Sequence, residues 1–285
     1  MKRNEFRLLD PLRVRWAEID SQQIVFNAHY LMYFDTAMGA YWRALLMPYH
    51  RTMADLGGDL YLRKASIEYL ASASYDDLLA VGLRCGRIGS SSIGFVGCVF
   101  NGERPLATAE LIYVFADPQA RKSKPVPDAL REAMDRFEAR QPMAEVRVGD
   151  WITLGDAARA IRSEVFVDEQ GIPPELEWDA ADAGCLHAVA FNAFGVAIGT
   201  GRLLVQMPGI AKIGRMAVDR GLRGNGVGRA ILDALTEAAC RKDIAEVLLH
   251  AQLSAVAFYS AAGFVTRGQR FDEAGIAHIE MVKRI

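Results

Sequence analysis

Residues 28–47 read AHYLMYFDTAMGAYWRALLM, and only His29, Asp35, Thr36 and Arg43 among them are strongly polar. A helix that is apolar all round must be enclosed on most of its sides. Stretches rich in β-branched and aromatic residues follow, separated by turn signals, and predict strands over residues 67–70, 79–88, 92–101 and 105–115. The first half of the chain therefore predicts one curved sheet around a long helix.

The chain is long enough for two domains, since 285 residues exceed the ~100–200 of an ordinary one. A polar, proline-rich segment over residues 117–127 precedes a charged amphipathic helix over 128–140. Gln141 and Pro142 end that helix, and a new strand pattern begins at Glu145. We therefore expect one domain at residues 1–140 and a second, differently folded one at 145–285.

Composition excludes several classes of function. The net charge is −2 and neither half is strongly basic, which argues against a nucleic acid partner. The four cysteines lie far apart without a CxxC pair, so neither a disulfide framework nor a metal site is expected. The N-terminus lacks the apolar core of a signal peptide, and polar residues interrupt the apolar region 183–205. We expect a cytoplasmic protein that does not associate with membranes.

Two acids, Glu18 and Asp20, precede the apolar helix. Acids near a helix N-terminus are stabilised by up to about 1 kcal/mol, which is sufficient to account for both. The same N–H groups can instead polarise a carbonyl oxygen while a nearby carboxylate attacks it or activates water. The residues themselves leave both interpretations open.

A longer pattern surrounds the start of this helix and consists of Asp20, Ile24, Val25, Asn27, Tyr30 and the run YFDTA at 33–37. It resembles the hot-dog-fold acyl-CoA thioesterases of the 4-hydroxybenzoyl-CoA type, over about residues 10–140. The resemblance implies an antiparallel sheet wrapped around the helix, and dimers or tetramers with sites at their interface. The family's loop aspartate, a nucleophile or general base, falls on Asp20. Asn27, His29 and Tyr30 then become neighbours of the thioester, whereas Glu18 has no such role.

One residue departs from the family pattern. Relatives have a glycine three residues after the aspartate, where this chain has Gln23, and glycine permits positive φ and close approach to a ligand. Asp35 is a second candidate carboxylate, because other hot-dog enzymes carry theirs on the helix. For Asp35 the sequence favours a buried, hydrogen-bonded acid instead. His29 is either a hydrogen-bond partner of the thioester or a structural residue.

A glycine-rich turn dominates the second half, in KIGRMAVDRGLRGNGVGRAILDALTEAA at 212–239. A predicted strand at 213–218 leads into the turn, and an amphipathic helix starts near Gly226. The amides of such a turn form a site for pyrophosphate. The chain lacks the Gly-Lys-Ser/Thr of a Walker loop and the complete G-x-G-x-x-G/A of a dinucleotide site. What remains is an R-x-x-G-x-G run: Arg223, Gly224, Asn225, Gly226, Val227 and Gly228.

This run resembles the coenzyme A loop of GNAT-type N-acetyltransferases, and the resemblance extends over about residues 145–285. FYSAAGF at 258–264 is similar to the family's F-Y-x-x-x-G-F segment, and VFVDEQGIP (165–173), EWD (177–179), HAQ (250–252) and FDEAGIAHIEM (271–281) are typical of a bacterial subgroup. The resemblance implies acetyl-CoA as substrate and coenzyme A as product. The strand around Met216 and Val218 would pair with the pantetheine amides, residues 223–228 would hold the pyrophosphate, and Tyr259 would protonate the departing thiolate.

The general base is left open by the sequence, with Glu273 and His278 as candidates, since histidine titrates near neutral pH. For His250, the sequence is equally consistent with a role in the site and with a hydrogen-bonded histidine in the core. Six acids and no lysine or arginine occur between Asp168 and Asp182. They predict either an acidic surface that attracts a cationic amine or a solvated loop.

Together the two halves predict an α+β protein with an N-terminal hot-dog domain and a C-terminal GNAT α/β domain, in which a mixed sheet is flanked by helices. The expected function is bifunctional: hydrolysis of an acyl-CoA thioester, and transfer of acetyl from acetyl-CoA to a primary amine. Two alternatives remain. The hot-dog domain is a non-catalytic acyl-CoA-binding or dimerisation module, or both domains only sense CoA esters. The acyl chain, the amine, the number of subunits and any coupling between the sites are left open.

Overall fold

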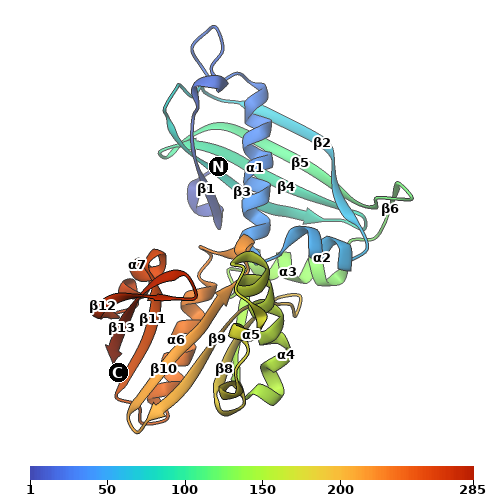
Figure 1. The fold of residues 1–285 in the computed structure, drawn as a ribbon. Helices are drawn as coiled ribbons and strands as arrows, with labels where there is room; N and C mark the ends of the chain where they lie inside the picture. The colour runs from blue at the N-terminus through green and yellow to red at the C-terminus, as the bar shows by residue number, and fades with distance from the viewer. The chain divides into compact units, whose positions relative to one another are not determined.

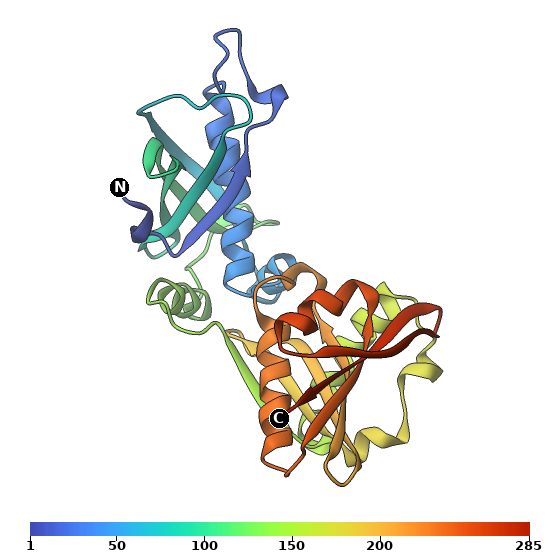
Figure 2. The ribbon, with the colours of Figure 1, turned by 90° about the vertical axis from the view of Figure 1, so that its left-hand side faces the viewer.

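A computed structural model describes all residues 1–285 of the chain (Figures 1 and 2). The chain divides into two compact units, Met1–Met143 and Ala144–Ile285. None of the helices is both long enough and apolar enough to cross a lipid bilayer.

The first unit contains one antiparallel sheet in the order β1-β3-β4-β5-β2, with the short β6 paired to the end of β5. Its strands are β1 (Leu8–Arg13), β2 (Asp59–Tyr69), β3 (Leu78–Ile88), β4 (Ser92–Asn101), β5 (Arg104–Asp117) and β6 (Lys122–Ser123). Its helices are α1 (Ala28–Ala44), α2 (Tyr49–Asp55) and α3 (Asp128–Glu138), with 3-10 turns η1 (Arg3–Glu5) and η2 (Trp16–Glu18). The predicted strands are all present, but β2 begins at Asp59 rather than at residue 67, and α2 was not predicted.

Helix α1 lies across one face of this sheet (Figure 1). Phe34 and Tyr41 on its inner side are fully buried. Strand β4 carries Gly97 under the helix, where a Cβ atom would lie 2.5 Å from the Phe34 ring. Glycine is therefore required at this crossing. Eight of the seventeen residues of α1 are buried, and the exposed ones, which include Asp35 and Arg43, lie on its outer side.

The second unit contains a seven-stranded sheet in the order β12-β13-β11-β10-β9-β8-β7, in which only β10 and β11 run parallel. Its strands are β7 (Ala144–Gly149), β8 (Leu186–Asn192), β9 (Ala197–Met207), β10 (Ile210–Val218), β11 (Glu246–Gln252), β12 (Val265–Glu273) and β13 (Ile276–Arg284). Its helices are α4 (Trp151–Arg162), α5 (Pro174–Glu177), α6 (Val227–Cys240) and α7 (Val256–Ala261), with a π-helical segment η3 (Ser163–Glu169) and 3-10 turns η4 (Ala180–Gly184), η5 (Arg220–Leu222) and η6 (Leu253–Ala255).

Successive side chains of a strand point to opposite faces of a sheet. In this sheet apolar side chains or glycines of the strands pack against helices on both faces. Val189 of β8 packs against α4, whereas Gly199 and Gly201 of β9 lie against side chains of α6. Figure 2 shows α6, in orange, on one side of the sheet and the yellow-green segment that contains α5 on the other. The α4 side of β9 carries Arg202, Leu204 and Gln206, which face a cavity.

Candidate functional site

A gap between β10 and β11 forms one end of this cavity. The two strands pair only from Ile210 to Lys212, opposite Glu246 to Leu248. Beyond Lys212 the edge of β10 has no strand partner on this side, while Val218 still pairs with β9 on the other. An unpaired strand edge offers N–H and C=O groups to an extended ligand. Met216 and Val218 line the cavity at this edge, where pantetheine was expected.

The glycine loop follows directly after β10. Gly224 and Gly226 have φ of +84° and +83°, a conformation that disfavours any side chain, and nothing lies within 4 Å of a Cβ built on either. Helix α6 begins at Val227, so the first amides of the helix, which include Gly228, have no intrahelical partner. The Asn225 side chain donates to the Leu222 carbonyl at 3.1 Å. The loop therefore presents backbone amides as a phosphate site does.

Arg223 of this loop is already engaged through its side chain. Its guanidinium donates to both oxygens of Glu169 at 2.7 and 2.6 Å, and its Nε donates to the Val218 carbonyl at 3.1 Å. Hydrogen bonding to Arg223, set against a smaller effect of burial, lowers the pKa of Glu169. Glu169 balances the positive charge of the Arg223 guanidinium, and this ion pair links the glycine loop to η3. We therefore expect Arg223 to bind a phosphate through its backbone N–H.

Tyr259 on α7 faces the same cavity. Its side chain is buried, with 8% exposure, between Phe258 and Phe264. Burial raises the pKa of the phenol to about 12. The hydroxyl therefore stays protonated at neutral pH, as a general acid must.

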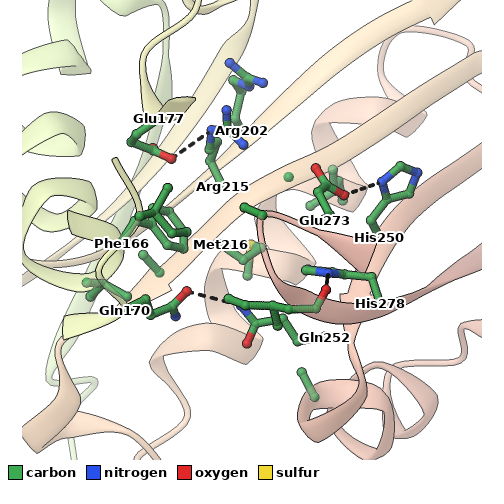
Figure 3. Close-up of a pocket in the computed structure, with 18 of the residues that line it drawn as sticks. Phe166, Gln170, Glu177, Arg202, Arg215, Met216, His250, Gln252, Glu273 and His278 are labelled. Carbon is green, nitrogen blue, oxygen red and sulfur yellow. Dashed lines mark hydrogen bonds and ion pairs between the residues drawn. The ribbon is translucent and has the colours of Figure 1, made fainter. Parts of the chain in front are cut away.

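Glu273 and His250 meet across the cavity from the arginines of β9 and β10 (Figure 3). His250 Nδ1 lies 2.9 Å from Glu273 Oε2 and 3.1 Å from Lys212 Nζ. Burial raises the pKa of Glu273, but the bond from His250 and the charge of Lys212 outweigh it and leave the pKa lowered. His250 is thus a cavity residue in contact with a candidate base, not a core residue. In the sequence, His250 begins the HAQ run at 250–252, and both His250 and Gln252 line the cavity.

His278 lies close by but is bonded differently. Its Nδ1 lies 2.7 Å from the Ile276 carbonyl, and its ring stacks on Phe271 at 6.0 Å between centroids. Since that carbonyl can only accept, Nδ1 carries a proton. The structure thus brings Tyr259, Glu273 and His278 to one cavity of about 710 Å³.

In the first unit, Asp20 opens a tight loop. Its N–H donates to the Ile24 carbonyl at 2.9 Å, its carbonyl accepts from Gln23 N–H at 3.0 Å, and its Oδ1 accepts from Gln22 N–H at 2.8 Å. Gln23 has φ of +63°. It thus adopts the left-handed conformation for which relatives have glycine, and the loop closes without it. The second Asp20 oxygen makes no hydrogen bond within the chain.

Glu18, two residues before Asp20, is buried and fixes the start of this loop through hydrogen bonds. Its carboxylate accepts hydrogen bonds from the Tyr33 hydroxyl at 2.8 Å and from the Arg15 backbone and Nε at 2.8 and 2.7 Å. Its side chain is only 2% exposed. Burial raises the pKa of Glu18, but these bonds together outweigh it and leave the pKa lowered. Glu18 is therefore a structural carboxylate.

Family models match both units. A model of the GNAT acetyltransferase domain matches residues 159–285, and a model of the thioesterase-like superfamily matches residues 14–134. The uncharacterized N-acetyltransferase YjcF of Bacillus subtilis is 36% identical over 124 residues, 43% of this chain and 87% of that protein. A protein of Aquifex aeolicus provisionally named an esterase is 33% identical over 97 residues, 34% of this chain and 75% of that protein. The chain belongs to both families, one in each half.

Two solved structures are similar to parts of this chain. An acyl-CoA N-acyltransferase from Pseudomonas aeruginosa is 30% identical with a TM-score of 0.45, covering 49% of this chain and 99% of that one. A thioesterase from Thermus thermophilus, complexed with coenzyme A and zinc, is 22% identical with a TM-score of 0.42, covering 49% of this chain and 98% of that one. The two family matches confirm the predicted architecture, a hot-dog domain followed by a GNAT domain.

In the GNAT domain, the acidic segment does not form a free acidic surface, which was one of the two alternatives that its sequence left open. Arg162 is fully buried and donates to Glu177 and, at 2.9 Å, to Asp182. Arg202 donates to Asp179 at 2.8 Å and to Asp182 at 2.7 Å. With Glu169 held by the glycine loop, four of the six acids have arginine partners. These arginines come from other parts of the chain, which is why the segment alone was misleading.

In the hot-dog domain, the remaining candidates differ in burial. Asp35 is exposed and makes no hydrogen bond, so the expectation of a buried, bonded acid is wrong. The Tyr30 hydroxyl is buried and accepts from Ala73 N–H at 3.2 Å. The Asn27 carbonyl accepts from the Tyr69 hydroxyl at 3.1 Å, while its side chain does not cap α1. His29 is partly exposed.

Nowhere in the chain do three His, Cys, Asp or Glu side chains lie close enough together to bind a metal ion.

Proposed function

We propose that the chain is a bifunctional acyl-CoA enzyme, an N-acetyltransferase in its GNAT domain and a thioesterase in its hot-dog domain. One observation carries the first activity. A protonated phenol, Tyr259, and a carboxylate–imidazole pair, Glu273 and His250, face one cavity beside the open edge of β10. These are the groups needed to give and accept protons in acyl transfer.

The proposed chemistry of the GNAT domain needs two proton transfers. The amine nitrogen attacks the thioester carbonyl of acetyl-CoA, and the new C–N bond forms as the C–S bond breaks. The Glu273–His250 pair accepts the proton that the amine loses. Tyr259 donates its proton to the departing thiolate, and the products are an acetamide and coenzyme A. Release of thiol that depends on an added amine, with the acetamide detected by mass spectrometry, tests this activity. Absence of product with every amine tried contradicts it.

Replacing Tyr259 with Phe is expected to lower kcat for acetyl transfer by about 10²-fold, the lower end of what a general acid contributes. The loss is limited because a thiolate is a stable leaving group. The KM for acetyl-CoA and the thermal unfolding should stay unchanged, since the ring still packs against Phe258 and Phe264. Thiol release with a saturating amine measures the effect. Wild-type kcat in the variant would remove Tyr259 from the mechanism.

For the hot-dog domain we propose hydrolysis of an acyl-CoA with Asp20 as nucleophile or general base. The positive φ of Gln23 supports this, since it shows that the loop takes the glycine-like conformation. One Asp20 oxygen orders the loop and the other is free to react. Amine-independent thiol release from a panel of acyl-CoAs tests the proposal. Failure with every chain length would favour a non-catalytic acyl-CoA-binding or dimerisation module.

Changing Gln23 to Gly is expected to leave hydrolysis unchanged and to alter stability by less than about 1 kcal/mol, because the backbone already has the conformation that glycine favours. Gln23→Val is the matched opposite change. A β-branched residue at positive φ costs about 1–3 kcal/mol of strain and should deform the loop. Steady-state hydrolysis and thermal melts of both variants check this. A large gain of activity in Gln23→Gly would show that glutamine distorts the site.

We also propose that the chain forms homo-oligomers through its hot-dog domain. Strand β2 is an edge strand of 11 residues, and its central residues 61–66 are all exposed. A long open edge with exposed apolar side chains such as Tyr61 and Leu62 is a site for pairing with another chain. Light scattering of the full chain should give at least twice the mass of 31.4 kDa, and Leu62→Glu should lower it. A single-chain mass for the wild type contradicts the proposal.

A further inference from the structure

Arg215 stands at an irregular position in the cavity wall of the GNAT domain. It occupies a bulge of β10 and has φ of +53°, a strained value for a residue with a side chain. Strain of about 1–3 kcal/mol persists where the surrounding structure holds it, often at functional sites. Its neighbour Gly214 also lines the cavity, and a Cβ atom built on Gly214 would have no other atom within 4 Å. The space next to the Gly214 backbone is therefore open.

The hydrogen bonds of Arg215 are weak compared with those of the other arginines. Its Nη2 lies 3.4 Å from the Leu176 carbonyl and 3.3 Å from Asp179 Oδ2. Its Nε lies 3.3 Å from Glu177 Oε2 but is buried without a hydrogen bond. A buried donor without a partner costs about 1–3 kcal/mol.

The two carboxylates that pair with Arg215, Glu177 and Asp179, are shared with other arginines. Glu177 accepts from Arg162, and Asp179 accepts from Arg202 at 2.8 Å. Arg215 is therefore a cation with unused donors in the cavity wall. Such a guanidinium fits a carboxylate or a phosphate, which can accept two parallel hydrogen bonds.

The charges of the cavity disfavour a second ammonium group on the acceptor. Lys212 also lines the cavity, and its Nζ lies 3.1 Å from His250 Nδ1. Glu273 is the one acid on that side, and it bonds to the same histidine. A diamine would place its second positive charge near Lys212 and Arg215 without a free carboxylate to bind it.

We infer that the acetyl acceptor is a small amine that also carries an anionic group, a carboxylate or a phosphate. The amine meets Glu273 and His250, and the anionic group binds Arg215 on the opposite side of the cavity (Figure 3). Gly214, the neighbour of Arg215 in the chain, also lines this cavity. This inference rests on the proposed acetyl transfer and adds the class of its acceptor.

Four acceptors of equal chain length test the inference on the full chain: an amino carboxylate, an aminoalkyl phosphate, an amino alcohol and a diamine. One of the two anionic amines is expected to have a kcat/KM about 10–100-fold above that of the amino alcohol, the range of one charge-assisted hydrogen bond. The diamine should be the poorest. A diamine that equals or exceeds both anionic amines overturns the inference.

Two variants locate the anionic group. Arg215→Gln should remove the preference for the anionic amine while the amino alcohol reacts as before. Gly214→Val should exclude the anionic amines, since its side chain enters the open space of the cavity. Gly184→Val is the matched control, because Gly184 also has open space around it and does not line the cavity. Equal losses for all four amines in Arg215→Gln, or no loss in Gly214→Val, overturn the inference.

Calorimetric titration in the presence of coenzyme A separates this inference from the proposed function. Binding of an anionic amine that Arg215→Gln weakens, without any acetylated product, contradicts acetyl transfer but supports the site. Product from the neutral amine or the diamine alone supports acetyl transfer and contradicts the site. Neither binding nor product contradicts both.

Discussion

Asp20→Asn is expected to lower kcat for acyl-CoA hydrolysis by about 10²–10⁴-fold, the contribution of a general base or activated nucleophile. The amide keeps the acceptor oxygen that binds Gln22 N–H at 2.8 Å, so the loop should keep its shape. What is lost is the negative charge that attacks the thioester or takes a proton from water. Amine-independent thiol release, measured with the best acyl-CoA of a panel, checks the effect.

Two other acids make this experiment specific. Asp55 is exposed at the end of α2, and Asp55→Asn controls for the change of net charge. Asp35→Asn tests the carboxylate on the outer side of α1. Loss of hydrolysis in Asp35→Asn but not in Asp20→Asn would move the reaction to the helix. Acetyl transfer should be unaffected in all three variants, because Tyr259 and its cavity belong to the other domain.

Arg162→Met is expected to destabilise the GNAT domain by about 3–5 kcal/mol, the cost of breaking a buried ion pair from one side. Arg162 has no exposed surface and donates to Glu177 and Asp182, which are 2% and 4% exposed. Methionine fills a similar volume but leaves both carboxylates buried with fewer donors. Urea unfolding of the full chain, followed by tryptophan fluorescence, measures the change, since Trp151 and Trp178 lie against Arg162.

Arg159→Met is the matched control for this experiment. Arg159 lies on the same helix and over the same two tryptophan rings, at 5.5 Å from each, but makes no ion pair. Its replacement should cost less than about 1 kcal/mol, the value of an exposed cation–π contact. Similar losses in the two variants would show that the aromatic contacts, and not the buried ion pairs, hold this part of the domain.

The parts of the fold that sequence alone predicted are those with a local pattern of burial. In strands β3 to β5 the side chains either alternate between buried and less buried positions or form continuous buried runs. Helix α1 carries a nearly continuous apolar run. The first half of β2 was missed because residues 61–66 are exposed on both faces. A strand without a buried face has no period-two pattern to detect.

The candidate site shows the same division. The glycine loop was recognisable because all its residues are consecutive. The partners of Arg215 and Arg162 were not, because Glu177 and Asp179 come from a segment that reaches these arginines only after folding. For the same reason His250 had no assigned partner until β11 and the end of β12 placed it beside Glu273.

The buried carboxylate of Glu18 makes the loop of Asp20 sensitive to acid. Because the folded state lowers the pKa of Glu18 below its ordinary value, the ionised form stabilises the fold fully above that ordinary value. This stabilisation is lost as the pH falls through the lowered, folded-state pKa. The protonated acid then binds Arg15 and Tyr33 less strongly, and Ile19, the residue that joins it to Asp20, is held less firmly. A carboxylate that takes no part in the chemistry thus sets the acid limit of the range in which the loop keeps its shape.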